Sequence, residues 1–341
     1  MRLQRAYYHC RSCKESGCPY DQHVDLNRHG LSSAMTEASV LLGTGHAFRG
    51  ASRLLKQLTG ISLDHRTIHR RLGEVGQAAA QGECDASDSA AQADLPQAEL
   101  EAQTMHAAAD GIMVRFRGGG GFKEVKVGLC YGVDRRDQPF CRHVARTESV
   151  ESFKWHVAAL TARCGLDGAD KSALVSDGAA WIWDHVASVL REDTRHIVDW
   201  YHASQHVWEC GKALHGEGTP ETATWVESIL DLLHDGQVRM ILQRLGDERS
   251  ATRSPAKREA LSGLITYVTN QDARLAYDRF RAEGFDIGSG RVEAACKQLV
   301  AQRLKGVGMA WSPRGAQAVL SMRSHWLNRT WDDFWRRRRA A

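Results

Sequence analysis

Apolar residues in the first part of the chain recur with the period of two short helices. The first helix is predicted from apolar positions that share one helical face, namely Phe48, Ala51, Leu54, Leu55 and Leu58. Gly60 follows, and glycine ends many helices in a left-handed conformation. A second helix is predicted after Ser62 or Asp64, either of which suits an N-cap. Its inner face is formed by Ile68, Leu72 and Val75.

The second predicted helix carries basic residues that mostly face outward. These are His65, Arg66, His69, Arg70 and Arg71. A helix, a glycine-containing turn and a basic helix form the layout of a helix-turn-helix, whose second helix enters the major groove of DNA. The alternative is an ordinary helical hairpin with a solvated basic face. We favour a helix-turn-helix DNA-binding region over residues 31–76.

Residues 77–103 are rich in alanine, glutamine and acidic residues and almost lack large apolar side chains. Such a segment cannot bury much surface, so we interpret it as an acidic linker or an exposed helix. We therefore expect a domain boundary between the helical region and the rest of the chain.

From residue 104 the pattern changes to the alternation of β-strands. Strands are predicted within 104–116, 123–134 and 140–149, with a glycine-rich turn at 117–121 between the first two. A helix over 150–165 follows, then a short buried strand at 173–176 and another at 197–198, each leading into a helix. Three antiparallel strands followed by alternating helices and strands indicate an α/β fold. Their order is that of the ribonuclease-H-like nucleotidyltransferase core.

Such a core needs an acid in the middle of the first strand, another just past the fourth strand and a third on a late helix. Asp110 and Asp177 meet the first two conditions, although acids at strand ends are common in general. Glu293 meets the third, on a helix that follows a mostly helical stretch. The alternative for Glu293 is a solvated carboxylate that interacts with a helix dipole.

The predicted domain organisation follows from these elements. The first part of the catalytic core spans 104–210, a helical insertion spans 211–285, and the C-terminal part of the core spans 286–341. The last of these segments ends in four consecutive arginines, which we expect to form a disordered tail that contacts phosphates.

Charge is distributed unevenly along the chain, whose net charge is +4. Residues 1–76 carry 11 basic and 6 acidic residues, and residues 286–341 carry 11 and 4, so both ends are positive. This distribution suits contact with a polyanion such as DNA, although basic faces are common on proteins. No apolar run approaches the roughly 20 residues that span a bilayer, and the first ten residues lack the apolar core of a secretion signal. We therefore expect a cytoplasmic, nucleoid-associated protein without membrane contact.

Of the nine cysteines, only Cys10, Cys13 and Cys18 cluster. Cys10-x-x-Cys13 supplies two thiolates at the reach of one tetrahedral zinc ion. A zinc ribbon needs a second pair, and none precedes Cys10. Cys18 with His9 or His23 would complete a site only in an unfamiliar spacing. Residues 1–30 are thus interpreted as a partial zinc knuckle that either binds Zn²⁺ or is the remnant of a ribbon.

Several stretches of the chain together resemble the DDE transposases of bacterial insertion sequences of the ISKra type, relatives of the Mutator-like transposases. The tetrapeptide DWYH at 199–202 matches their D-x-x-H signature. The stretch IGSGRVEAACKQLVAQRLKGVGMAWSPRGAQAVLSMR at 287–323 is the most specific match. The likeness covers nearly the whole chain, with RAYYHCRSC resembling the second knuckle of the family's zinc ribbon and 47–76 its helix-turn-helix. The departure is the missing first C-x-x-C.

The resemblance implies that Asp110, Asp177 and Glu293 form a metal-binding triad for two Mg²⁺ ions, with Mn²⁺ as a substitute. Two such ions roughly 4 Å apart activate the attacking oxygen and stabilise the leaving one. Asp110 would bridge both ions, and the other two acids would take one each. Asp199 is the rival for the second position, but Asp177 ends the strand expected beside the first strand.

Other residues are given accessory roles by the same resemblance. Asp199 and His202 are interpreted as support for the site, with core packing as the alternative for His202. We expect the basic residues of the late helix to contact the DNA backbone; the alternative is a solvated face. They are Lys297, Arg303 and Lys305.

The implied function is that of a transposase that binds the ends of an insertion sequence and catalyses DNA cleavage and strand transfer. Its partners would be double-stranded DNA, both terminal inverted repeats and target DNA, and further copies of the chain, as a homodimer or larger assembly. The main alternative is a truncated or domesticated remnant that binds DNA without catalysis. The missing knuckle favours that alternative, and the complete set of acids opposes it. A ribonuclease-H-like structure-specific nuclease is a third interpretation.

Overall fold

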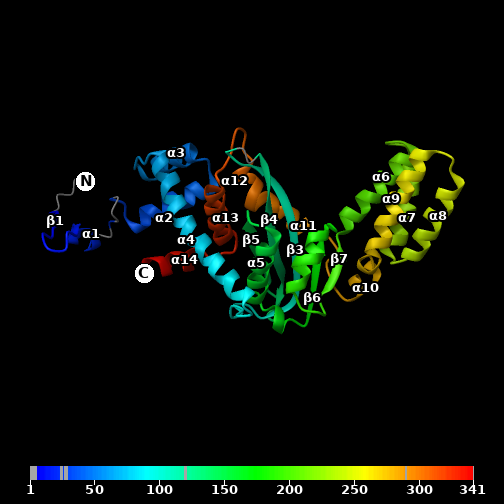
Figure 1. Cartoon of the computed structure of the whole chain (residues 1–341), viewed down its shortest axis with the longest axis horizontal. Helices are drawn as coiled ribbons and strands as arrows, with labels where there is room; N and C mark the ends of the chain where they lie inside the picture. The colour runs from blue at the N-terminus through cyan, green and yellow to red at the C-terminus, as the bar shows by residue number, and fades with distance from the viewer. Residues whose placement is uncertain (1–5, 24–25, 27–29, 119–120, 289, 341) are drawn as a thin grey trace. The chain divides into compact units, whose positions relative to one another are not determined.

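The computed structural model describes residues 6–23, 26, 30–118, 121–288 and 290–340. The chain divides into two compact units, one of Met1–Gln81 with Trp311–Ala341 and the other of Gly82–Ala310 (Figure 1). No helix in the described ranges is both long enough and apolar enough to cross a membrane. Residues 119 and 120 of the predicted glycine-rich turn lie outside the described residues.

The first unit is helical apart from a two-residue hairpin near its start. Its elements are β1 (Tyr8–His9), β2 (Ser16–Gly17), α1 (Pro19–His23), α2 (Ser33–Gly45), α3 (Phe48–Thr59), the first part of α4 (His65–Ala91), α13 (Pro313–Leu327) and α14 (Trp331–Ala340).

The helix boundaries predicted for α3 and α4 are confirmed at their capping residues. Gly60 has φ 71° and ends α3 in the left-handed conformation, which costs glycine little because it has no Cβ. Asp64 precedes α4, and its Oδ1 accepts a hydrogen bond from the Arg66 amide at 2.8 Å. Ile68, Leu72 and Val75 are buried, as the periodicity predicts.

The C-terminal residues 311–341 were predicted to belong to the catalytic core, but in the structure they belong to the helical unit. From Trp311 onward they belong to the helical unit, where the Arg323 side chain donates to the Thr44 carbonyl oxygen at 3.0 Å. A Cβ on Gly76 would lie 2.3 Å from the Ala318 carbonyl oxygen, so α4 and α13 approach with their backbones nearly touching. The terminal arginines are also helical, not a disordered tail, because Trp335 of α14 is buried.

Residues 77–103, predicted as an acidic linker or an exposed helix, are helical in their first half and mostly exposed and non-helical from 92 to 100. The helix α4 continues to Ala91 and therefore includes about half of residues 77–103. Its small residues permit close packing instead of exposure: Ala90 is buried against Ala158 and Ala159. Low apolar bulk did not prevent burial here, because alanine loses no side-chain entropy on folding.

The second unit is built on a mixed sheet of five strands in an α/β fold. The strands are β3 (Ala102–Arg115), β4 (Phe122–Asp134), β5 (Pro139–Arg146), β6 (Lys171–Ser176) and β7 (Arg195–Val198). Their order is β5-β4-β3-β6-β7 (Figure 1). The first three strands pair antiparallel, and β6 and β7 add in parallel to β3. The predicted strands are thus confirmed.

Alternate residues of β3 face opposite sides of this sheet. Ala107 and Ala109 pack with Phe153 and Val157 of α5 (Val150–Arg163), so this side is covered by α5. The short helical segments η1 (Leu166–Gly168), η2 (Ile182–Val186) and η3 (Ala187–Val189) connect the elements of the core. Asp110 alternates with Ala109 and faces the side that carries α11 (Gly290–Ala295), η5 (Cys296–Ala301) and α12 (Gln302–Leu304).

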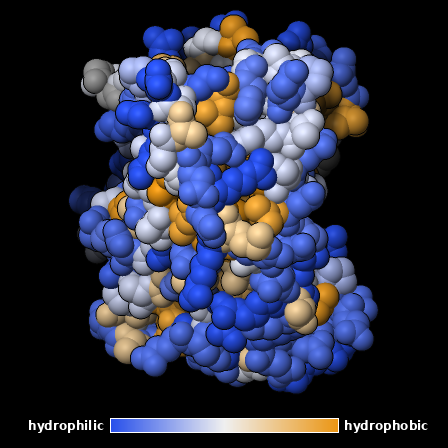
Figure 2. All heavy atoms as spheres, turned by 90° about the vertical axis from the view of Figure 1, so that its right-hand side faces the viewer, coloured by the Kyte–Doolittle hydropathy of each residue, from blue (hydrophilic) through white to orange (hydrophobic). Residues whose placement is uncertain are grey.

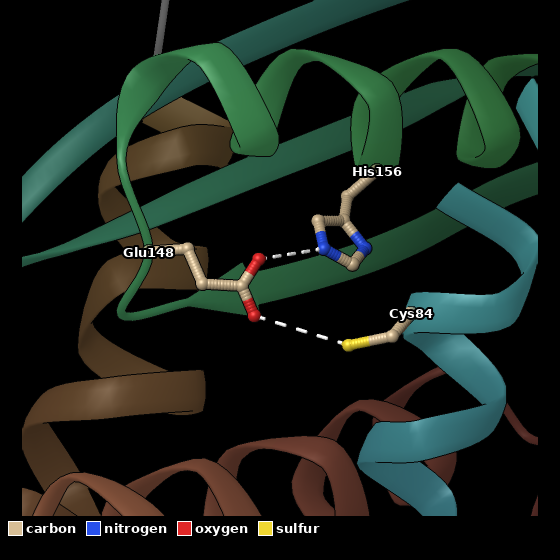
Figure 3. A group of neighbouring side chains, drawn as sticks. All are labelled: Cys84, Glu148 and His156. Atoms are coloured by element: carbon tan, nitrogen blue, oxygen red, sulfur yellow. Dashed lines mark hydrogen bonds and ion pairs between the residues drawn. The ribbon is translucent and has the colours of Figure 1, made fainter. Parts of the chain in front are cut away.

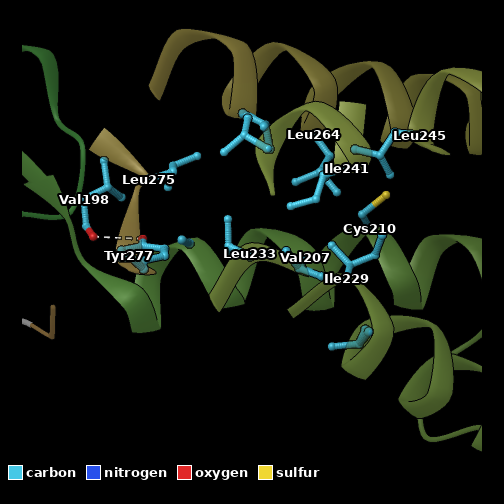
Figure 4. Close-up of a cluster of buried hydrophobic side chains, with 14 of the residues drawn as sticks. Val198, Val207, Cys210, Ile229, Leu233, Ile241, Leu245, Leu264, Leu275 and Tyr277 are labelled. Atoms are coloured by element: carbon cyan, nitrogen blue, oxygen red, sulfur yellow. Dashed lines mark hydrogen bonds between the residues drawn. The ribbon is translucent and has the colours of Figure 1, made fainter. Parts of the chain in front are cut away.

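Between β7 and α11 the chain forms the predicted helical insertion. Its elements are α6 (Trp200–His215), α7 (Pro220–His234), α8 (Val238–Ala251), α9 (Pro255–Gln271), η4 (Asp272–Arg274) and α10 (Tyr277–Ala282). The helices begin directly after β7, earlier than the predicted boundary at 211. Their apolar faces form one core that reaches Val198 of β7, where the Tyr277 hydroxyl donates to the Val198 carbonyl oxygen at 2.9 Å (Figure 4). The face at this end is mostly hydrophilic with small separate apolar spots (Figure 2).

Candidate metal site

The strand register places three aspartates side by side at one edge of the sheet. Ala108 of β3 pairs with Val175 of β6, so Asp110 and Asp177 both lie two residues beyond a paired position. Ser176 of β6 pairs with Val198 of β7, so Asp177 and Asp199 each follow that pair by one residue. The carboxyl ends of parallel strands are where α/β proteins commonly bind ligands.

Glu293 reaches the same place from a distant part of the chain. It lies in the first turn of α11, which runs directly into η5, a segment of π-helix. Such segments are rare and often occur at functional sites. From η5, the thiol of Cys296 donates to Asp110 Oδ2 over 3.3 Å, which ties this helix to the middle of the sheet.

The loop before α11 is held against the start of α6. The Trp200 amide donates to the Ile287 carbonyl oxygen at 2.8 Å. A Cβ on Gly288 would lie 3.2 Å from the Tyr201 ring, tighter than most such contacts, so a larger residue would push the loop away. The two most specific sequence motifs are therefore adjacent in the fold.

Asp110, Asp177, Asp199 and Glu293 line one pocket of about 220 Å³. Its remaining described lining residues are Ala109, Tyr201, His202, Gln205 and Val292, without a lysine or an arginine. The predicted triad is thus brought together, and so is the rival Asp199. Within the described part of the chain, however, the three carboxylates of the triad are not a set whose ligand atoms all lie within 4.8 Å of one another.

Electrostatics at Asp110 reflect this concentration of acids. Burial raises the pKa of Asp110, and the charges of Asp177 and Glu124 raise it further. Hydrogen bonds from the Gly111 amide, at 2.6 Å, and from Cys296 act in the opposite direction on this pKa. The carboxylate is therefore oriented by two donors but has no cationic partner among the described residues. A bound cation would relieve this repulsion.

The carboxylates of Asp177 and Asp199 accept hydrogen bonds from different backbone amides. Asp177 Oδ1 accepts from the Ala179 amide at 2.9 Å in the turn after β6. Asp199 is 2% exposed and is the N-cap of α6, where its Oδ2 accepts from the His202 amide at 3.0 Å. Each carboxylate therefore accepts a backbone amide and lines the pocket, so the preference for Asp177 over Asp199 as the metal ligand stays a prediction.

His202 is half-buried and lines the pocket beside Asp199. Its Nε2 lies 3.3 Å from Nε2 of His206, whose ring packs on Tyr267 with centroids 4.0 Å apart. Burial lowers the pKa of His206, and the neighbouring His202 adds to this effect. His202 therefore both packs and faces the pocket, so its supporting role stays a prediction.

The basic residues expected to contact DNA fall into two groups. Exposed or half-exposed positions are His65, Arg66, His69, Arg70, Lys297 and Lys305. The prediction that Arg71 and Arg303 face outward is wrong, since their exposed fractions are only 4% and 2%. Arg71 forms an ion pair with Glu74 at 2.6 Å on the same helix. The long aliphatic stems of arginine allow such burial along an apolar face.

The N-terminal cysteines Cys10 and Cys13 lie in the turn of the short β1–β2 hairpin. Both are exposed, and the Cys13 amide donates to Cys10 Sγ at 3.5 Å. This hydrogen bond lowers the pKa of Cys10. No third ligand atom from the described residues joins the two thiols within 4.8 Å. Zinc binding at Cys10 and Cys13 stays a prediction.

Several side chains near these groups were not expected from the sequence. Cys296, Glu124, Tyr201 and Gln205 lie at or beside the pocket. A further group, Cys84, Glu148 and His156, brings three potential metal ligands within 4.8 Å of one another. Its members are 64 and 8 residues apart in sequence, so no local motif signals the group.

Two comparisons with known proteins found no match. No protein-family model matches the chain. No curated protein matches it either.

Proposed function

We propose that this chain is a metal-dependent transposase of the DDE type with a ribonuclease-H-like core. The observation that carries the proposal is the acid pocket: Asp110, Asp177 and Glu293 come from three distant segments and line one cavity without a lysine or an arginine among its described residues. The order and directions of the five strands support the inferred type of core. The most specific sequence motifs lie around this pocket.

The chemistry suits these residues. Mg²⁺ prefers a few carboxylates together with water and phosphate oxygens, and the pocket offers carboxylates in an open cavity. When bound, the metal ions would activate the attacking oxygen and stabilise the leaving oxygen of a phosphodiester. Because two ions share the ligands in such a site, the three carboxylates need not all meet at one point.

The protein's own part is to hold the carboxylates in place. Asp110 is oriented by the Gly111 amide and the Cys296 thiol, and Asp177 by the Ala179 amide. Water would attack first to free a 3′-hydroxyl at the element end, and that hydroxyl would then attack target DNA. Tyr201 and His202 line the pocket, and we expect them to contact the DNA near the scissile phosphate.

We propose that α3 and α4 act as a helix-turn-helix and recognise DNA. Its outward residues Arg66, His69 and Arg70 are exposed at the start of α4, where a recognition helix contacts base edges. On the late helix, Lys297 and Lys305 remain as exposed phosphate contacts. Arg71 and Arg303 are removed from this set because they are buried.

The test uses DNA that carries the inverted repeats flanking the gene, with Mg²⁺ and the full chain. We expect nicking at the repeat ends and strand transfer into a second DNA, with both lost in Asp110→Asn, Asp177→Asn and Glu293→Gln while repeat binding is retained. Full activity in any one variant would remove that residue from the triad. Binding of the repeats by the wild type without nicking would instead establish the non-catalytic alternative.

A further inference from the structure

A second cluster of ligand-type side chains lies outside the acid pocket, where α4 meets the turn between β5 and α5. Cys84 comes from α4, Glu148 from the turn and His156 from α5 (Figure 3). The two oxygens of Glu148 point to different neighbours: Oε1 lies 4.0 Å from Cys84 Sγ, and Oε2 lies 3.0 Å from His156 Nε2. We call these residues, with Glu83 and Arg146, the Arg146 cluster.

We propose that Cys84, Glu148 and His156 form a second metal site, which takes a divalent ion of the zinc class. This site does not depend on the proposed transposase activity. The ligand set contains a thiol, an imidazole and a carboxylate, which are the three side-chain types that bind zinc in proteins. A thiol ligand disfavours Mg²⁺, which prefers oxygen.

The spacing of the ligand atoms fits a tetrahedral ion. Zinc–ligand bonds of about 2.0–2.3 Å at tetrahedral angles place ligand atoms about 3.3–3.7 Å apart. The oxygen–sulfur and oxygen–nitrogen distances of 4.0 and 3.0 Å bracket this range, and all three atoms lie within 4.8 Å. Small rotations of Glu148 would therefore equalise the distances. Three protein ligands leave the fourth position for a water molecule.

Charged groups surround the ligand atoms of the cluster. Arg146 is buried and pairs with Glu83 at 2.6 Å and with Glu148. A thiol that binds a metal ion gives up its proton, so the ion would bring two positive charges and the thiolate one negative charge to this group. The carboxylates of Glu83 and Glu148 would face both the ion and Arg146, so that the buried charges of both signs keep partners.

Arg146 itself fits as a partner of the metal ligands. Its guanidinium donates to Cys84 Sγ at 2.9 Å and to Glu148, so it would contact the thiolate and the carboxylate from outside the ion. Such outer donors orient metal ligands in many sites. The Glu148 carbonyl oxygen accepts from the buried Lys126 side chain at 3.1 Å, which fixes the turn.

The occupied site would fasten the last turns of α4 to the start of α5. The interface between these helices also contains the contacts of Ala90 with Ala158 and Ala159, against which Ala86 and Trp155 pack. A metal ion adds a bond between segments more than 60 residues apart in sequence. A structural rather than catalytic role follows from the near-complete burial of His156, which is 4% exposed.

The test is cobalt substitution in the full chain carrying Cys10→Ser and Cys13→Ser, which removes the N-terminal thiols. We expect one thiolate-bound Co²⁺ per chain, measured by a near-ultraviolet sulfur-to-cobalt charge-transfer band that Zn²⁺ removes by competition; Co²⁺ held by the carboxylates of the acid pocket does not contribute to this band. Cys84→Ser should abolish the band, and His156→Gln should weaken Co²⁺ binding more than about 100-fold, beyond what loss of an outer partner costs. Cys296→Ala and Cys141→Ser are the matched controls and should keep the band.

Two outcomes would overturn the proposal. The first is persistence of the charge-transfer band in Cys84→Ser, which would show that another thiol binds the ion. No thiolate band in the parent protein, with its fold intact by circular dichroism, would show that the cluster is an ion-pair network only. Neither outcome bears on nicking by the acid pocket, so the two proposals fail separately.

Discussion

The acid pocket and the Arg146 cluster lie in the same unit but differ in whether their carboxylates have cationic neighbours. In the pocket, Asp110, Asp177 and Glu293 gather without a cationic partner from the described residues, and burial raises the pKa of Asp110. In the cluster, Glu148 faces His156 and Arg146, and its hydrogen bond with His156 is the main cause that lowers its pKa to about 2. One site lacks positive charge, whereas the other supplies its own.

This difference separates the chemistry of the two sites. Uncompensated carboxylates gain most from a hard cation that brings charge without protons, such as Mg²⁺. A cluster that contains a thiol and its own cation gains from a softer ion that binds the thiolate, such as Zn²⁺. We therefore expect the pocket to serve phosphoryl chemistry and the cluster to serve stability. Substitutions at Asp177, Asp110 and Cys296 test the pocket, and a substitution at Glu148 tests the cluster.

The largest effect is expected for catalysis in Asp177→Asn. Loss of one metal carboxylate should lower the rate of Mg²⁺-dependent nicking about 10³-fold, because metal stabilisation of the transition state amounts to several kcal/mol. The matched control is Asp184→Asn, an exposed acid seven residues further along the chain that does not line the pocket. Single-turnover nicking measures both variants. Equal rates for the two would place the chemistry elsewhere.

The next largest effect is a loss of stability in Glu148→Gln. With chelator present, we expect the free energy of unfolding to fall by about 2–3 kcal/mol, since the buried Arg146 loses one of its carboxylate partners. The lowered pKa of Glu148 means that its contribution is present above pH 4.5 and is lost as pH falls from 4.5 towards about 2. The wild type should therefore lose its advantage over the variant in that window.

Urea denaturation at pH 7 and pH 3 measures this difference. Asp170→Asn is the control, because its ion pair with Arg135 is about half exposed on both sides and should contribute about 0–1 kcal/mol. If Glu148→Gln and Asp170→Asn are equally mild, the cluster does not depend on its buried charges.

Asp110→Asn should act in the opposite direction on stability. A raised pKa means that the folded state holds the proton more tightly than the unfolded state, so stability falls as pH rises from 3.8 through the raised pKa. Without divalent ions, the variant should be more stable than the wild type by about 1 kcal/mol at pH 7. Gains of this size are common when a residue that is retained for function, and that destabilises the fold, is replaced. The gain should vanish below pH 3.8, and Mg²⁺ should stabilise only the wild type. A destabilised variant at pH 7 would show that Asp110 is not under repulsion.

The smallest effect is expected for Cys296→Ala. Removing the thiol that donates to Asp110 Oδ2 deletes one hydrogen bond, worth about 1 kcal/mol, and should weaken Mg²⁺ binding roughly fivefold. Cys296→Ser keeps a donor and should restore most of the affinity. Calorimetric titration with Mg²⁺ compares the two variants. No difference from the wild type would make Cys296 a packing residue only.

The sequence predicts the parts of the molecule that depend on local patterns. Alternation predicted the strands of the sheet, and Gly60 and Asp64 predicted the helix ends of α3 and α4. The expectation that Asp110, Asp177 and Glu293 meet came from motifs, and the register of β3 with β6 shows how two of them become neighbours.

The remaining features depend on tertiary contacts that no local pattern carries. Arg303 has the sequence of an exposed basic residue, but packing around α12 buries it. The chain beyond Trp311 joins the helical unit because α13 fits against Gly76, where a single missing Cβ decides the approach. The Arg146 cluster joins three elements, and its parts look like ordinary surface residues when taken separately.

The most direct test of the acid pocket is the position of a divalent ion in a crystal of the full chain soaked with Mn²⁺. We expect an anomalous difference peak within direct bonding distance of the Asp110 and Asp177 carboxylates and a peak shared with Glu293, both absent in Asp110→Asn. A map without manganese among these three carboxylates, at concentrations that support nicking, would contradict the proposed site.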